Sequence, residues 1–280
     1  MLFSKEELRR LIVPLMIEQI LAVTIGMADT MMVANVGEAA VSGVSLVDSI
    51  NILLINIFSA MATGGAVVAS QYIGRQDRQN ACSAAKQLIY SSAFIALLLG
   101  LLALVGGEHL LRLVFGSVDA DVMAYAETYF WLSALSYPFL AVYNAGAALF
   151  RSMSNSSISM KTSILMNIIN IGGNALLIYG FDMGVAGAGT ATLVSRATGA
   201  VVMMWLLRNR HNLIYVEHLF HYRLDWQMVK RILRVGVPNG LENGMFQVGK
   251  VLVSSLIAMF GTTAITANAI ANNLASFECI

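Results

Sequence analysis

The sequence predicts an all-α membrane protein that crosses the bilayer several times. Its 280 residues are 58% hydrophobic and only 12% charged, whereas a soluble domain carries about 25% charged residues. The apolar residues form runs long enough to cross a bilayer, which takes roughly 20 residues per helix. Three carboxylates, Glu18, Asp29 and Glu242, lie inside these runs. A charged group at membrane depth is costly, so such residues are typical of ion and substrate paths.

Eight apolar runs predict eight helices. The first run follows a basic N-terminus, but it contains Glu18 and no cleavage site of small residues follows it, so we interpret it as a retained helix and not as a signal peptide. Short polar segments rich in Gly, Ser, Asp and Arg separate the runs. The predicted helices span residues 8–36, 44–73, 85–106, 122–150, 158–181, 185–207 and 232–259, and the last runs from 264 to the end.

The positions of Lys and Arg predict the orientation in the membrane. Of the 17 Lys and Arg residues, fourteen flank the connections on the side of the N-terminus, whereas the alternate connections hold only Arg112. Arg196 and Lys250 lie inside predicted helices. Because cytoplasmic loops carry the excess of positive charge, we expect a multi-pass protein of the inner cell membrane with a cytoplasmic N-terminus.

The longest connection, residues 208–230, mixes charged residues with aromatic residues and leucines. Two interpretations of this loop fit its composition. It lies along the inner membrane surface, as amphipathic segments do, or it is a solvated linker.

The chain contains an internal repeat. A shift of 224 residues aligns Pro14 with Pro238, Glu18 with Glu242 and Gly37 with Gly261, within seven identities over 39 positions. Parallel repeats of this kind occur in transporters whose substrate site lies between two halves. We therefore expect an N-terminal six-helix transmembrane lobe (1–207), a cytoplasmic inter-lobe loop (208–230) and the start of a C-terminal lobe (231–280).

The repeat also predicts the size of the whole protein. If the second copy is as long as the first, the protein has roughly 450 residues and twelve helices. The present chain is then a C-terminally truncated part that holds a complete first bundle and the start of a second, parallel-repeat bundle.

Several segments in order resemble the multidrug and toxic compound extrusion (MATE) family, in particular its NorM-like bacterial branch. They are Met27–Val33 with Gly37, Ala69–Gly74, Phe150–Met153, Asn167–Asn174, Gly184–Thr192 and Pro238–Glu242. The resemblance implies two six-helix bundles that form a V-shaped antiporter, which expels organic cations in exchange for Na⁺ or H⁺. It also implies a cation site formed by Asp29, Asn170, Asn174 and Thr192, in which Asn174 stands where one branch has aspartate.

The residue types agree with such a site. A carboxylate in a low-dielectric cleft can hold a proton and release it when another cation arrives. Asp29 can therefore bind either a proton or another cation, but not both at once. Amide oxygens of Asn170 and Asn174 suit Na⁺, as hard oxygen ligands suit related cations; the alternative is that they join helices as polar glue. Glu18 lies eleven residues before Asp29 on the same helical face. Glu18 and Glu242 are further candidates for cation coupling or substrate binding.

We therefore predict a secondary multidrug efflux transporter that works by alternating access, and not an enzyme. Its expected partners are small organic cations and membrane lipid, without nucleic acid. We expect a monomer, no catalytic residue and no cofactor besides the coupling ion. Two alternatives remain open. A flippase for a lipid-linked precursor would share the layout but need a more arginine-rich cavity, and an intramembrane enzyme would need histidines at membrane depth, whereas all four histidines lie in predicted loops.

Overall fold

The computed structural model describes residues 5–116, 118–217 and 224–278. Throughout these ranges the regular secondary structure is helical, which confirms the predicted all-α fold. A π-helical segment, η1 (Ala175–Gly180), continues the fifth helix. Residues 218–223 of the predicted loop and 279–280 of the predicted last helix lie outside the described residues. The α-helices are α1 (Lys5–Ala34), α2 (Glu38–Gly74), α3 (Arg78–Phe115), α4 (Ala120–Ser152), α5 (Ser156–Asn174), α6 (Gly184–Leu207), α7 (Trp226–Ala258) and α8 (Thr262–Glu278).

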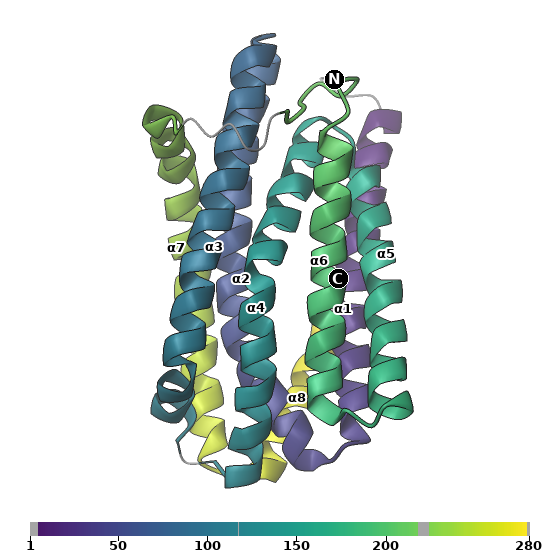
Figure 1. The fold of residues 1–280 in the computed structure, drawn as a ribbon, viewed down its shortest axis with the longest axis vertical. Helices are drawn as coiled ribbons and strands as arrows, with labels where there is room; N and C mark the ends of the chain where they lie inside the picture. The colour runs from purple at the N-terminus through teal and green to yellow at the C-terminus, as the bar shows by residue number, and fades with distance from the viewer. Residues whose placement is uncertain (1–4, 117, 218–223, 279–280) are drawn as a thin grey trace.

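The long helices run side by side along the long axis of the molecule (Figure 1). The central helix is α4, which packs against α2, α3 and α6. On one side α1 packs chiefly against α5, and on the other α7 packs against α2 and α3. The α8 helix contacts α2 more closely than it contacts α1.

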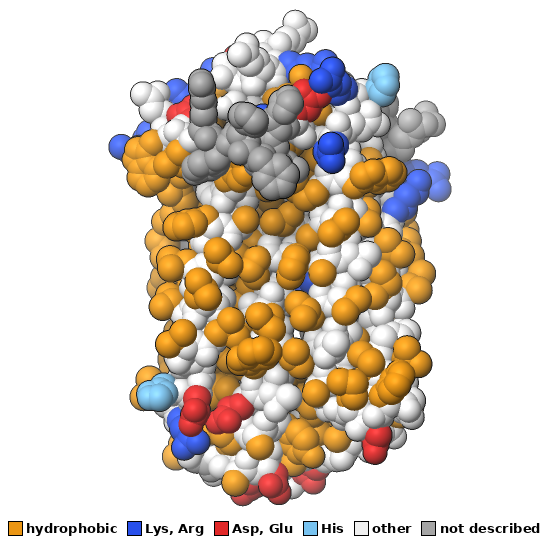
Figure 2. Space-filling view, viewed as in Figure 1, with side chains coloured by type: hydrophobic (Ala, Val, Ile, Leu, Met, Phe, Trp, Pro, Cys, Tyr) orange, Lys and Arg blue, Asp and Glu red, His pale blue; other side chains and the backbone are white. Residues whose placement is uncertain are grey.

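Five helical spans in the described residues are long and apolar enough to cross a membrane. They are Leu11–Ala34, Glu38–Gly74, Arg78–Phe115, Ser156–Gly180 and Gly184–Leu207. Figure 2 shows hydrophobic side chains over the middle of one face and Lys and Arg gathered at the end that holds the start of the chain. We call this end, which holds Arg75, Arg78 and Arg151, the basic end, and the opposite end the far end.

The third helix is longer at both ends than the sequence predicts. It begins at Arg78 because the carboxylate of Asp77 caps it, accepting hydrogen bonds from the backbone N of Asn80 (3.1 Å) and from Asn80 Nδ2 (2.6 Å). The Asn80 side chain and backbone donors hold the pKa of Asp77 below its usual value. The prediction ended the helix at the pair Gly106 and Gly107. In the structure a Cβ at Gly107 would lie 2.7 Å from the ring of Phe130, so this glycine permits close packing on α4 inside a continuing helix.

Two apolar clusters fill the bundle, one toward each end. The cluster near the basic end includes Leu149, Phe150 and Met203, and the cluster near the far end includes Val33, Ala40 and Phe115. Buried polar side chains of α2, α4, α5 and α6 lie between and beside these clusters. They form the site described below.

The first part of the long loop is anchored on the bundle. Ile214 and Val216 are fully buried in the apolar cluster at the basic end. The guanidinium of Arg78 donates to the carbonyls of Arg210 (2.7 Å), Asn212 (2.7 Å) and Leu213 (3.2 Å) and stacks on the ring of Tyr215. Neither interpretation of the sequence predicted this anchoring of residues 209–216, because composition does not show that α3 supplies a charged partner for their carbonyls.

The helix boundaries repeat with the shift found in the sequence. The α1 helix ends at Ala34 and the α2 helix begins at Glu38. At the equivalent positions of the repeat, α7 ends at Ala258 and α8 begins at Thr262. The turns carry Gly37 and Gly261 with φ of 142° and 91°, values that favour glycine. The two helical hairpins therefore share the same helix ends and the same type of glycine turn.

Candidate functional site

A chain of hydrogen bonds joins the four predicted cation-site residues. Asn174 Nδ2 donates to Asp29 Oδ1 and lies 3.5 Å from Asn170 Oδ1, and Asn170 Nδ2 donates to Thr192 Oγ1 at 3.2 Å. All four side chains are buried, Asn174 completely. The structure thus brings α1, α5 and α6 together at one buried polar group, which we call the Asp29 group.

The local structure explains how α5 presents its two amides. Asn170 and Asn174 are four residues apart and therefore lie on one face. Asn174 is the last residue of α5 before the backbone passes into the π-helical turn η1. Such turns often occur at functional sites. The sequence did not predict this segment, because its residues are compatible with an ordinary α-helix.

The amide orientation at Asn174 follows from its partner. A carboxylate accepts hydrogen bonds when ionised, so Asn174 turns its nitrogen toward Asp29. Its Oδ1 is then left without a hydrogen-bond partner among the described residues. The carboxylate of Asp29 and the unpartnered amide oxygen of the asparagine that donates to it are both ligands for hard cations, so these two side chains can bind a small cation.

A second carboxylate, Asp48 on α2, extends the polar region. It interacts with the hydroxyl of Tyr129, which also contacts Thr192, and its charge acts on that of Asp29. Asn51 lies at the centre of this region: its Nδ2 donates to Asp48 Oδ1 (3.2 Å) and Ser133 Oγ (3.3 Å). Its Oδ1 accepts from the Tyr137 hydroxyl at 2.8 Å.

Arg196 on α6 supplies positive charge beside these carboxylates. Its Nη1 donates to Ser136 Oγ at 2.7 Å, and its charge acts on both Asp29 and Asp48. The sequence marked Arg196 as a basic residue inside a helix. It did not predict Tyr129 as a contact of the site, because the link between α4 and α6 depends on tertiary packing.

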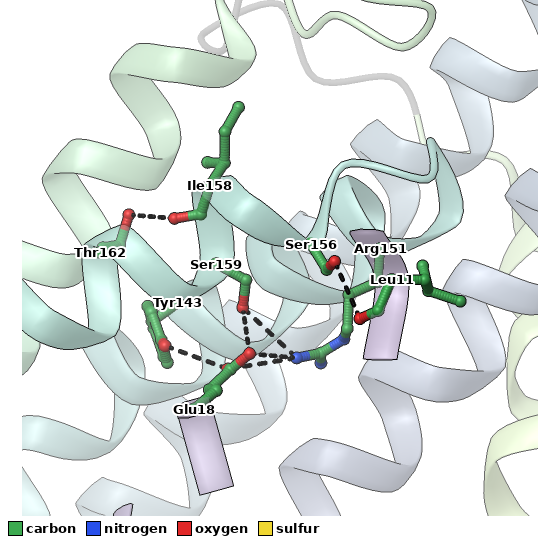
Figure 3. Close-up of polar contacts among 8 residues, drawn as sticks. All are labelled: Leu11, Glu18, Tyr143, Arg151, Ser156, Ile158, Ser159 and Thr162. Carbon is green, nitrogen blue, oxygen red and sulfur yellow. Dashed lines mark hydrogen bonds and ion pairs between the residues drawn. The ribbon is translucent and has the colours of Figure 1, made fainter. Parts of the chain in front are cut away.

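Glu18 lies nearer the basic end, in a separate cluster (Figure 3). Ser159 Oγ donates to Glu18 Oε2 at 2.8 Å, and Arg151 Nη1 lies 3.3 Å from Glu18 Oε1 in an ion pair. The hydroxyl of Tyr143 approaches Oε1 at 3.5 Å. Glu18 and Asp29 both meet α5, as expected for residues on one face of α1, but at different levels.

Glu242 lies apart from both groups. It is on α7, and its side chain is exposed. No hydrogen bond or ion pair given for the described residues joins it to the Asp29 group. The structure therefore unites Asp29, Asn170, Asn174 and Thr192, and it places Glu18 and Glu242 elsewhere.

The sequence also matches a family model and known transporters. The MatE family model matches residues 14–176. The chain is 28% identical over 272 residues to an uncharacterized transporter, YisQ, of Bacillus subtilis, covering 94% of this chain and 58% of the relative. It is 27% identical over 283 residues to a probable multidrug resistance protein NorM of Thermotoga maritima, covering 98% of this chain and 59% of the relative. The chain thus spans about three-fifths of the length of these relatives.

Solved transporter structures share the fold. An outward-facing multidrug resistance MATE family transporter superposes with a TM-score of 0.78 at 21% identity, covering 98% of this chain and 67% of that one. An inward-facing form superposes with a TM-score of 0.76 at 20% identity, covering 94% and 60%. Because the MatE family model covers more than half of the chain, the chain belongs to the MatE family, a family of transporters and not of enzymes.

Proposed function

We propose that this chain belongs to a secondary multidrug transporter that exchanges Na⁺ or H⁺ for organic cations. Residues 1–207 form its N-terminal lobe, 208–230 the inter-lobe loop and 231–280 the start of its C-terminal lobe. Drugs as cargo are supported by the name of one relative, a probable multidrug resistance protein. The alternating-access cycle is supported by related folds solved in inward-facing and outward-facing forms.

The proposal rests on the buried carboxylate of Asp29, which accepts a hydrogen bond from Asn174, and on the unpartnered amide oxygen of that asparagine. A negative site at membrane depth attracts any cation that fits. When a small cation neutralises Asp29, an organic cation loses its electrostatic attraction to the same place. Binding of one occupant therefore weakens binding of the other, which is the requirement for exchange.

The predicted orientation also belongs to this proposal. The basic end carries Arg75, Arg78, Arg151 and the anchored loop, and the excess of positive charge at one end is typical of the cytoplasmic side. The coupling cation then enters from the far end, and cargo enters from the basic end.

The test is transport of a fluorescent organic cation in inverted vesicles that contain the full-length protein, where efflux from the cytoplasmic side appears as uptake into the lumen. A Na⁺ gradient and a pH gradient are imposed separately. We expect one gradient to drive efflux and Asp29→Asn to reduce it at least tenfold with unchanged expression. The exposed Asp182→Asn serves as the matched control and should retain efflux. Efflux that persists in Asp29→Asn would contradict the role of Asp29.

A second candidate is transport of a lipid-linked precursor with a negatively charged headgroup. Arg196 favours it, because this guanidinium lies within the bundle beside the polar site. The acidic residues around it favour cationic cargo instead. If neither gradient drives efflux of an organic cation, lipid flipping by the same protein becomes the function to measure.

A further inference from the structure

A buried polar stripe on α5 connects the Asp29 group to the Glu18 cluster. Its members are Ser159, Ser163, Asn167, Asn170 and Asn174. Their spacing of three or four residues places them on one helical face. At 1.5 Å per residue, the stripe extends over roughly 22 Å. It begins at Ser159 beside Glu18 and ends at Asn174 beside Asp29, both on α1.

Polar stripes often only join helices, but two oxygens of this stripe have no hydrogen-bond partner among the described residues. Asn167 is 4% exposed, and its Nδ2 donates to the carbonyl of Ser163 at 2.9 Å. A carbonyl can only accept, so this bond fixes the amide orientation. Asn167 Oδ1 consequently has no hydrogen-bond partner among the described residues, and neither does Asn174 Oδ1. Two buried acceptors at different levels of one stripe indicate that a donor or a cation belongs beside them.

The stripe reaches solvent through the Glu18 cluster. The Tyr143 hydroxyl approaches Glu18 (Figure 3). The same hydroxyl interacts with Ser159 and Ser163. Arg151, about one-third exposed, closes this end with its ion pair to Glu18. Ion pairs with solvent access are weak, so Arg151 can leave Glu18 when another positive charge arrives there.

We propose that the stripe is a path by which the coupling cation leaves the Asp29 group toward the basic end, with Glu18 and Arg151 as its gate. The proposal rests on the proposed cation exchange and adds a route inside the N-terminal lobe, separate from any cleft between lobes. The cation moves past Asn170 and Asn167 to Ser163 and Tyr143. At the exit it replaces Arg151 beside Glu18. Asn167 is the intermediate binding position.

Thiol modification tests the path directly. Ser163→Cys is introduced in the full-length protein after every native cysteine, Cys82 and Cys279 included, has been replaced by serine. A small positively charged methanethiosulfonate is then added to one side of oriented vesicles. We expect modification from the side of the basic end, slowed by the coupling cation and accelerated at least fivefold by Glu18→Gln, which weakens the hold on Arg151. Separate Na⁺ and pH series identify the protecting cation.

The control is Ile168→Cys, which lies near the same level of α5 with an exposed, lipid-facing side chain. It should stay unmodified by the charged reagent. Absence of modification at Ser163→Cys in both backgrounds, or equal modification from both sides, would overturn the path. This result does not depend on drug efflux, so failure of the path and failure of the proposed function are distinguishable.

Asn167→Leu tests whether the path carries the coupling cation. The apolar side chain removes the intermediate oxygen, and we expect drug-coupled cation release on the side of the basic end to slow at least tenfold. The half-saturating drug concentration should stay within twofold of wild type. Unchanged release in folded Asn167→Leu protein would show that the stripe only packs helices.

Discussion

The carboxylate of Asp29 is buried in the bundle and has few hydrogen-bond partners. Asn174 donates one hydrogen bond to it, and Arg196 acts on it from a distance. A fully satisfied carboxylate would have little to gain from a cation, whereas among the described residues Asp29 accepts one side-chain hydrogen bond, from an asparagine whose own amide oxygen has no hydrogen-bond partner there. The proposed exchange depends on this incomplete satisfaction.

The Asp29 group could be predicted because its residues occur in recognisable segments of the chain. The partners of Glu18 could not. Arg151 lies at the end of α4 and Ser159 at the start of α5, and only the packing of α1 against α5 brings them to Glu18. Sequence position gives the level of a residue in the membrane but not the neighbour that it meets.

Asn51 offers a test of the polar region at single-residue level. Asn51→Leu removes the bonds to Asp48, Ser133 and Tyr137 and leaves buried polar groups unpaired. We expect the free energy of unfolding to fall by about 2 kcal/mol, measured by thermal unfolding in detergent. Asn56→Leu, which loses one bond to the Ile52 carbonyl within its own helix, should change it by less than about 0.5 kcal/mol. Equal effects would contradict the central position of Asn51.

Among the elements, helix existence followed directly from the apolar runs. Each of the eight predicted ranges falls on helical structure, but residues 35–36, 181 and 259 lie just beyond the helix ends. The lengths of the helices could not be predicted from the apolar runs. The α3 helix extends into polar sequence because Asp77 caps it, and it continues past Gly106 and Gly107. The η1 segment and the anchored loop depend on contacts between distant residues, which a one-dimensional pattern does not contain.

The packing of α7 on α2 rests on a glycine contact. A Cβ at Gly64 would lie 2.7 Å from the backbone N of Gly236 and the carbonyl of Ile232. Gly64→Ala therefore forces the helices apart, and we expect it to lower the free energy of unfolding by about 1–3 kcal/mol.

Gly172→Ala is the matched control for this prediction, because a Cβ there meets nothing within 4 Å. It should leave stability unchanged or raise it by up to about 1 kcal/mol, since alanine favours helix. Thermal unfolding of both variants in one detergent measures the difference. A Gly64→Ala protein as stable as wild type would contradict the close contact.

In the whole molecule, the repeat has a physical counterpart between α2 and α8. Ser42 and Thr266 are equivalent under the 224-residue shift, and their hydroxyls lie 2.9 Å apart in a hydrogen bond. Equivalent residues of two copies contact each other where the axis that relates the copies passes between them. This contact, with the matching helix ends, supports the predicted parallel repeat. The size of the second bundle stays a prediction.

The proposed exchange requires that a small cation and an organic cation exclude one another at Asp29. The decisive measurement is equilibrium binding of a fluorescent organic cation to the purified full-length protein, titrated with Na⁺ and separately with acid. We predict that one of these cations raises the half-saturating concentration of the fluorescent ligand at least tenfold in wild type and less than twofold in Asp29→Asn. Competition of equal strength in both proteins would show that the exclusion does not arise at Asp29.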